Sequence, residues 1–147
     1  MRINLFYYRL LRFLDQSSYT TLIYGAGWKI VSSINNFNRQ FPFGDDKDTF
    51  KYFGDLDREG IKIWHNLYNR YNVELEIKFY SELLNCTYSI GKETQIPNKE
   101  SVKDFCKLMN LDIEDMLNQM FENNKYIPQE ALDDTVIKRI IGVSDGK

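Results

Sequence analysis

The stretch Tyr52-Phe53-Gly54-Asp55-Leu56-Asp57-Arg58-Glu59-Gly60 decides how we expect this chain to fold. Residues 49–53 form an aromatic and β-branched run, which predicts a short buried strand. After Gly60, apolar residues recur at helical spacing, namely Ile61, Trp64, Leu67, Tyr68 and Tyr71. The sequence therefore predicts a strand, a tight turn and a helix. Its acidic residues lie at the carboxyl end of the strand, where open α/β sheets bind their ligands.

Asp55 and Asp57 are candidate metal ligands. Residues two apart in an extended segment point to the same side, so both carboxylates can face one point. Two like charges this close raise one pKa or require a counter-ion, and Mg²⁺ binds oxygen ligands of this kind. Gly54 and Gly60 would let a backbone or a phosphate approach closely. A structural interpretation stays open, in which Asp57 caps the helix and Asp55 is a turn residue.

Composition limits the class of protein. The 147 residues suit one domain, residues 1–147, and a hydrophobic content of 43% is ample for a core. The net charge of −2 gives no global attraction to nucleic acid, so phosphate binding requires a local patch, a metal or a partner. Cys86 and Cys106 are expected to be reduced thiols. We expect a cytoplasmic protein, because no apolar run reaches the ~20 residues of a membrane span and arginines interrupt the aromatic N-terminus.

The remaining chain predicts alternating strands and helices. Expected strands lie at 19–24 and 73–80, with a short extended segment at 125–128. A helix follows Gly25-Ala26-Gly27 to about residue 36, residues 41–48 form a polar loop, and further helices lie at 99–109, 112–123 and 129–141. This order predicts an α/β domain with a central, mostly parallel sheet of about four strands flanked by helices. Gly25-Ala26-Gly27 lacks the third glycine of a dinucleotide-binding turn.

Three stretches together resemble the C-terminal Toprim-like domain of the JetD family, the nuclease subunits of bacterial Wadjet anti-plasmid defence systems. They are Tyr-Gly-Ala-Gly at 24–27, Tyr-Phe-Gly-Asp-Leu-Asp-Arg-Glu-Gly-Ile-Lys-Ile at 52–63, and Ile-Pro-Gln-Glu-Ala-Leu at 127–132. In that family a Gly-Asp-hydrophobic-Asp-x-x-Gly motif follows an aromatic strand, and a Gln-Glu pair lies near the C-terminus. The order and the rough spacing agree over most of the chain.

The resemblance implies a Toprim-like Rossmannoid fold, related to topoisomerase VI A subunits, and metal-dependent cleavage of DNA. It implies that Asp55, Asp57 and Glu130 are catalytic and bind Mg²⁺ or Mn²⁺. Family members also carry a glutamate just before a segment like residues 2–6. We expect it upstream of Met1, which makes the chain the C-terminal fragment of a longer protein and leaves its activity in isolation open. The implied partners are double-stranded DNA, subunits of a condensin-like SMC complex and a second copy of the chain.

Five basic residues are candidates for neutralising DNA phosphates: Lys29, Arg58, Lys62, Lys138 and Arg139. The alternative for each is an ordinary solvated charge. His65 is the only histidine, and surface or core packing is the expected role rather than general base. Trp28 and Trp64 are expected to pack between helix and sheet rather than stack on bases.

Two rival functions remain at this point. The first is a non-catalytic interaction module, in which the Toprim-like body docks on partner subunits and the aspartates are only a turn residue and a helix cap. The second is a phosphatase or phosphotransferase that uses Asp55 and Asp57 as nucleophile and acid. That class requires a lysine and further acidic residues at set positions after the motif.

Overall fold

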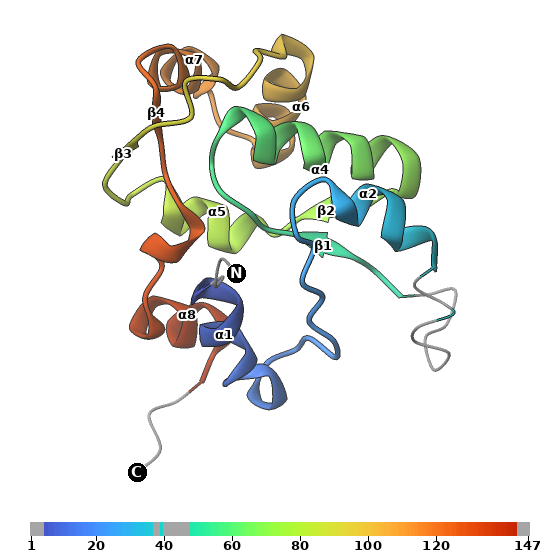
Figure 1. Cartoon of the computed structure of the whole chain (residues 1–147). Coiled ribbons are helices and arrows are strands. Elements are labelled where there is room, and N and C mark those ends of the chain that lie inside the picture. Colours follow the sequence, from blue (N-terminus) through green and yellow to red (C-terminus); the bar gives the residue numbers. More distant parts are fainter. Residues whose placement is uncertain (1–4, 37–38, 40–47, 144–147) are drawn as a thin grey trace.

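The computed structural model describes residues 5–36, 39 and 48–143 and has a mixed α/β fold. Helices α6 (Lys99–Met109) and α7 (Glu114–Glu122) lie at the top of Figure 1, above α4 (Arg58–Tyr71). Two short parallel strands lie at the centre, and α1 (Leu5–Leu11) packs beside α8 (Asp134–Ile141) at the bottom. The first and last described helices therefore support the same end of the molecule.

The predicted strand, turn and helix are confirmed. Strand β1 (Lys51–Tyr52) pairs in parallel with β2 (Glu74–Leu75), and α4 connects them in a β–α–β unit. Helix α4 begins after Asp57, whose carboxylate accepts a hydrogen bond from the Gly60 N–H, and ends at Asn72 with a left-handed φ of 57°. Strong caps at both ends explain why this helix is long and well defined.

A second pair of strands and one isolated bridge complete the β structure. Strand β3 (Ser89–Ile90) pairs antiparallel with β4 (Lys125–Tyr126), and helices α6 and α7 lie between them in the chain. Leu56 and Ile127 form an antiparallel bridge through two backbone hydrogen bonds of 2.8 and 3.2 Å. The expected α/β class is confirmed. In the part of the chain that the structure describes, however, the strands form two two-stranded sheets, of which one is parallel.

The prediction of one strand over residues 73–80 is wrong beyond Leu75. Strand β2 ends there, and helix α5 (Ile77–Leu83) follows. The alternation of buried Val73 and Leu75 is typical of a strand, but Phe79, Tyr80 and Leu83 are buried at helical spacing. Glu76 is buried between the two elements, and its carboxylate accepts a hydrogen bond from the Tyr19 hydroxyl.

The N-terminal segments depart from the prediction. Residues 19–24 were predicted as a strand and have no regular structure. The next helix is shorter than expected, with α2 (Lys29–Ser33) running into the 3-10 helix η2 (Ile34–Asn36). Most of the polar loop expected at 41–48 lies outside the described residues.

The C-terminal elements match in position. Helix α6 has the predicted bounds, and α7 begins two residues after its expected start. The predicted last helix is divided into the 3-10 helix η3 (Gln129–Ala131) and α8. The division falls at Asp133, because its side chain accepts from the Val136 N–H and caps α8. A further 3-10 helix, η1 (Leu14–Gln16), follows α1.

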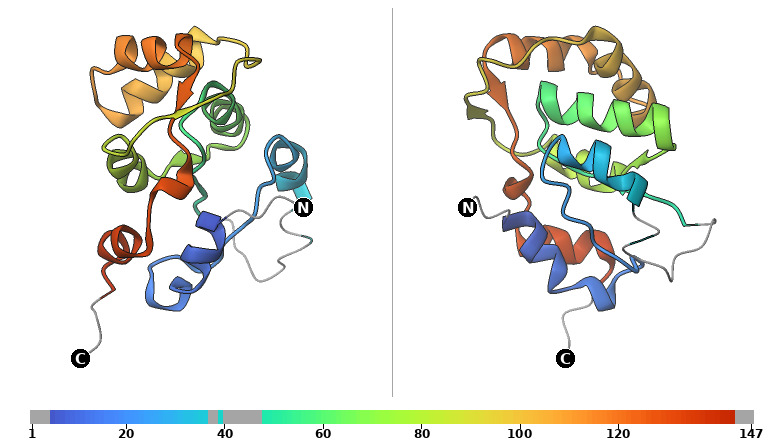
Figure 2. Two further views of the ribbon diagram at one scale, coloured as in Figure 1. Left: turned by 60° about the vertical axis from the view of Figure 1, so that its left-hand side comes forward. Right: turned by 45° about the vertical axis from the view of Figure 1, so that its right-hand side comes forward.

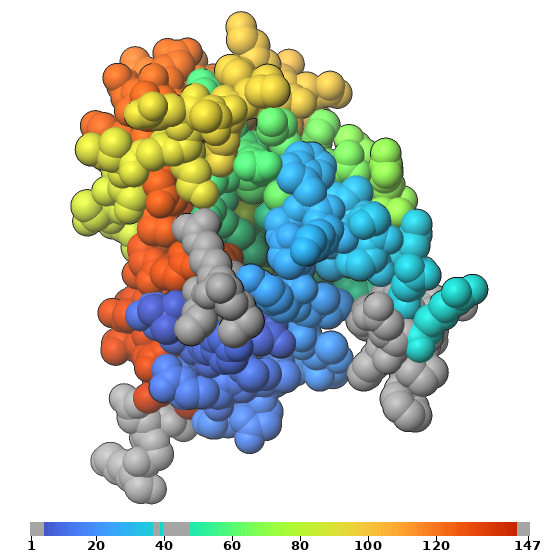
Figure 3. Space-filling view, viewed as in Figure 1, coloured from blue at the N-terminus to red at the C-terminus, as the bar shows by residue number. Residues whose placement is uncertain are grey.

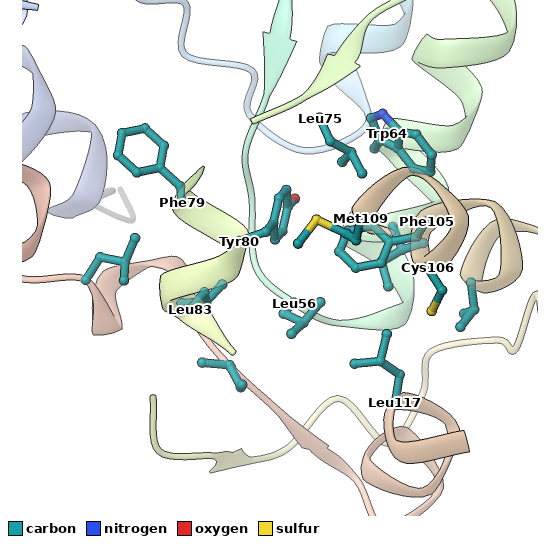
Figure 4. Close-up of a cluster of buried hydrophobic side chains, with 14 of the residues drawn as sticks. Leu56, Trp64, Leu75, Phe79, Tyr80, Leu83, Phe105, Cys106, Met109 and Leu117 are labelled. Atoms are coloured by element: carbon teal, nitrogen blue, oxygen red, sulfur yellow. The ribbon is translucent and has the colours of Figure 1, made fainter. Parts of the chain in front are cut away.

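The core is aromatic and is built around the central helices. Figure 4 shows the fully buried Leu56 among side chains from α5, α6 and α7. The ring of Phe105 contacts Tyr80 at 5.1 Å and Trp64 at 6.0 Å between centroids, both edge-on. Burial of Leu56 fixes the segment between the two aspartates. Both cysteines are free thiols, and among the residues that the structure describes no helix is long and apolar enough to cross a membrane.

Candidate functional site

The candidate site lies where β1 turns into α4, and the chain after β4 completes it. The Leu56–Ile127 bridge brings residues 127–130 alongside residues 55–57. The backbone N–H of Gln129 then donates to Asp55 Oδ1 at 2.9 Å. One oxygen of Asp55 is thus fixed by the C-terminal part of the chain, and the other is directed elsewhere.

Asp57 serves as the helix cap that the structural interpretation predicted. Its Oδ1 accepts from the Gly60 N–H at 2.6 Å, and its Oδ2 accepts from Gln95 Nε2 at 3.1 Å. The side chain is buried. Gln95 also accepts from the Glu59 N–H at 3.2 Å, so one amide side chain binds two residues of the first turn of α4.

The second oxygens of both aspartates face one ammonium group. Lys92 Nζ lies 3.4 Å from Asp57 Oδ2 and 3.7 Å from Asp55 Oδ2, and 4.9 Å from the centre of the Tyr126 ring. The expectation that these carboxylates need a cation between them is therefore correct in its electrostatics. In this structure a side chain supplies the positive charge.

Sequence reasoning missed Lys92 and Gln95. Both lie on the irregular segment between β3 and α6, which carries no periodic pattern. What distinguishes this segment is its backbone conformation, which the structure shows and the sequence does not. Gly91 and Lys92 both have positive φ, at 144° and 69°. A left-handed lysine is uncommon and points to a position that the surrounding structure determines.

The site carries excess negative charge in a partly desolvated place. Burial raises the pKa of Asp55, and the charges of Asp57 and Glu130 raise it further, against the lowering effects of the Gln129 N–H and Lys92. The pKa of Tyr52 is also raised, by burial and then by Asp57 and Asp55. A further cation at this place would relieve the repulsion.

Glu130 joins the aspartates around one cavity. It lies on η3, and its backbone carbonyl accepts from Arg9 Nη1 at 2.7 Å, which attaches the segment to α1. Asp55, Asp57, Glu130 and Lys92 all line a cavity of about 1020 Å³. All three residues that were predicted as catalytic and metal-binding therefore line one cavity, although their carboxylate oxygens do not all lie within 4.8 Å of one another.

The opposite wall of the cavity comes from the segment before α2. Tyr24, Gly25, Ala26 and Gly27 line it, so all three stretches on which the resemblance rests contribute to one cavity. Trp28 Nε1 donates to Glu59 Oε1 at 2.8 Å and ties this wall to α4. Both views in Figure 2 show α2 alongside α4, and Figure 3 shows light-blue residues of this segment against the green of α4.

The predicted DNA-binding residues are dispersed. Arg139 Nη2 pairs with Glu82 Oε2 at 2.8 Å, Lys138 Nζ lies 5.3 Å from the Phe13 ring, and the Arg58 guanidinium lies 5.9 Å from the Phe121 ring. Lys29 is exposed at the start of α2, and Lys62 lines a smaller, separate cavity. None of the five is among the described residues that line the large cavity.

The aromatic and histidine predictions have different outcomes. Trp64 is buried, and its Nε1 donates to the Val73 carbonyl at 3.3 Å, as expected of a packing residue. The same expectation is wrong for Trp28, whose side chain is 43% exposed at the rim of the cavity. His65 is buried on α4 and lies 2.8 Å from Asp104 Oδ2, consistent with packing.

Comparisons with protein-family models, curated proteins and solved structures gave no match to this chain. The site must therefore be interpreted from its own geometry and from the motif resemblance.

Proposed function

We propose that the chain is a Toprim-like, metal-dependent DNA endonuclease domain whose cavity holds the scissile phosphodiester. The observation that carries the proposal is that Asp55, Asp57 and Glu130 line one cavity, in which the Oδ2 atoms of both aspartates face a single cation. The β1–α4–β2 unit, with the acidic residues at the carboxyl end of β1, supports a Rossmannoid arrangement of this kind.

The donor set fits Mg²⁺ or Mn²⁺. All three candidate ligands are carboxylates, which are hard oxygen donors. Burial, followed by the charges of Asp57 and Glu130, raises the pKa of Asp55, and a divalent ion would neutralise that charge. Such an ion, bound by Asp55, Asp57 and Glu130, would polarise a phosphate and lower the pKa of a bound water. Lys92 would then lose its role as counter-ion and become available to a phosphate oxygen.

The proposed substrate is double-stranded DNA, and its delivery requires help. The chain has a net charge of −2, and its candidate phosphate-binding residues are dispersed over the surface. In the proposal, subunits of a condensin-like SMC complex bring the DNA in the cytoplasm. A second copy of the chain would cut the second strand.

A second candidate function is a non-catalytic interaction module. It is favoured by the fact that each of the four carboxylate oxygens of Asp55 and Asp57 already has a protein partner. In this alternative, Lys92 balances the charge permanently and the cavity accepts a segment of a partner subunit.

Calorimetric titration of Mn²⁺ separates the two functions. Weak binding by the wild type should disappear in Asp55→Asn/Asp57→Asn, where asparagine keeps the ability to cap α4. Asp133→Asn is the matched control, because Asp133 caps α8 in the same way. Lys92→Met should bind Mn²⁺ more tightly than the wild type, since the competing ammonium is gone. Equal heats for the wild type and the double variant would end the metal hypothesis and leave the interaction module.

A further inference from the structure

A second group of potential metal ligands lies between α4 and α6. His65 comes from α4, and Glu100 and Asp104 come from α6. One ligand atom from each residue can be chosen so that all lie within 4.8 Å of one another. His65 Nε2 and Asp104 Oδ2 already form a close contact of 2.8 Å.

The local sequence explains why these side chains meet. Glu100 and Asp104 are four residues apart, so they project from the same face of α6. Asn98 caps this helix by accepting from the Ser101 N–H at 3.0 Å, which fixes the first turn that carries Glu100. The contact of Trp64 with Phe105 holds α4 against α6 beside the cluster.

The charges of the cluster are not balanced by its own members. A simple ion pair needs one carboxylate for one imidazole. Two carboxylates, those of Glu100 and Asp104, lie near the His65 imidazole. His65 Nε2 also lies 3.4 Å from Asn69 Nδ2. A divalent ion would balance both carboxylates with a neutral imidazole, which is the form that binds metals.

An orphaned acceptor next to the cluster supplies an independent observation. Asn66 Oδ1 is buried and has no hydrogen-bond partner among the residues that the structure describes. Asn66 and His65 both line a cavity of about 290 Å³, which also contacts Lys62 and Arg70. A buried carbonyl oxygen without a donor is costly, and a small movement of the Asn66 side chain toward this cavity would let a water molecule held there by an ion satisfy it.

We propose that His65, Glu100 and Asp104 bind one Zn²⁺ ion that fastens α4 to α6. An imidazole nitrogen with two carboxylate oxygens suits Zn²⁺, whereas Mg²⁺ prefers oxygen ligands alone. Three protein ligands leave a fourth position for a water molecule. The water is placed in the small cavity that His65 and Asn66 line, where it would donate a hydrogen bond to Asn66 Oδ1 once that side chain turns toward the cavity. This site is separate from the carboxylates of Asp55 and Asp57 and does not rest on the proposed function.

The single histidine of the chain makes the test direct. Zn²⁺ is titrated into the full chain at pH 7 while NMR follows the imidazole nitrogens of His65. One equivalent should shift them in the wild type, and Mg²⁺ should not. Glu100→Gln and Asp104→Asn should each weaken binding by at least about 10-fold, since even residues that only support ligands have effects of that size. Asp115→Asn, an exposed acidic residue of α7, should bind like the wild type.

The thermal unfolding midpoint gives a second readout. Zn²⁺ should raise it for the wild type and not for Glu100→Gln, whose exposed position leaves the fold intact. His65 signals that ignore equimolar Zn²⁺, or equal affinity in Glu100→Gln, would reduce the cluster to a histidine–aspartate pair. Asp55→Asn/Asp57→Asn should keep the Zn²⁺ response, so failure of the nuclease proposal and failure of this site give different results.

Discussion

Gly60 lies so close to Asp55 that no other residue fits there: a Cβ on Gly60 would stand 2.3 Å from the Asp55 carbonyl oxygen and 3.0 Å from Asp57 Oδ1. Helix propensity alone predicts that Gly60→Ala stabilises α4 by about 1 kcal/mol. We expect the opposite, a loss of about 1–3 kcal/mol, because the clashing atom is backbone. Urea denaturation measures the change. Ser81→Ala, on an exposed face of α5, is the control and should be neutral or slightly stabilising. A gain of stability in Gly60→Ala would mean that the turn between β1 and α4 has room for a Cβ.

Lys92→Met should lower the free energy of unfolding at pH 7 by about 1–3 kcal/mol, the cost of leaving partly buried polar groups without a partner. The variant keeps most of the length of the side chain but leaves the Oδ2 atoms of Asp55 and Asp57 without their cation. Lys125→Met is the control, because Lys125 is exposed on β4. An unchanged stability in Lys92→Met would show that solvent already screens the pair.

Asp55 should make the protein more stable as the pH falls. Burial raises its pKa in the folded protein above the usual value of 3.8, so the folded state binds this proton more tightly than the unfolded state. The resulting destabilisation is fully present above the folded pKa and disappears as the pH falls toward 3.8. Asp55→Asn should therefore be more stable than the wild type at pH 7, and the difference should vanish in acid. Chemical denaturation from pH 3 to pH 8 checks the sign, and a difference that is constant with pH would contradict it.

Tyr80→Phe should destabilise the protein by about 1–2 kcal/mol, because it leaves the buried Gly54 N–H without its acceptor. The Tyr80 oxygen accepts this hydrogen bond at 3.0 Å, at the point where β1 ends and the acidic turn begins. Tyr88→Phe is the control, since Tyr88 is exposed. Hydrogen exchange at the Gly54 amide should accelerate in Tyr80→Phe alone, and unchanged exchange would rule out the bond as the source of protection.

The two thiols should differ in reactivity. Burial raises the pKa of Cys106 to about 11, and burial followed by the charge of Glu82 raises the pKa of Cys86. At pH 8 the thiolate fraction of Cys106 is on the order of 100-fold below that of an ordinary cysteine. A thiol reagent should label Cys86 slowly and Cys106 only after unfolding. Cys86→Ser and Cys106→Ser assign the two rates, and fast labelling of Cys106 would contradict its buried position.

The sequence predicted the elements whose signals are local. The strand, turn and helix around Asp57 depend on aromatic residues before the turn, a capping carboxylate and helical spacing after it, all within a few residues. The bounds of α6 were predicted for the same reason, since Asn98 caps its start and Asn110 ends it with a φ of 55°. The convergence of Asp55 and Asp57 on one cation followed from the spacing of extended residues.

The remaining features depend on tertiary contacts. Over residues 73–76, a strand gives the same alternation as an extended turn that precedes a helix. Burial of Phe79 against Phe53 and of Tyr80 against Phe105 selects the helix. Lys92 reaches the aspartates only because β3 pairs with β4 and places the irregular segment after it beside the turn. No local pattern marks such an approach, which is why nothing in the sequence indicated Lys92 beside the aspartates.

The bridge between Leu56 and Ile127 also sets an order of events during translation. Asp55 and Asp57 leave the ribosome long before Gln129, whose N–H group anchors Asp55, and long before Glu130. In a partly synthesised polypeptide the segment that anchors Asp55 and carries Glu130 is absent, so the three carboxylates have no common geometry. Assembly of the acidic cavity is thus a late step in biogenesis, and immature chains emerging from the ribosome lack whatever chemistry it supports.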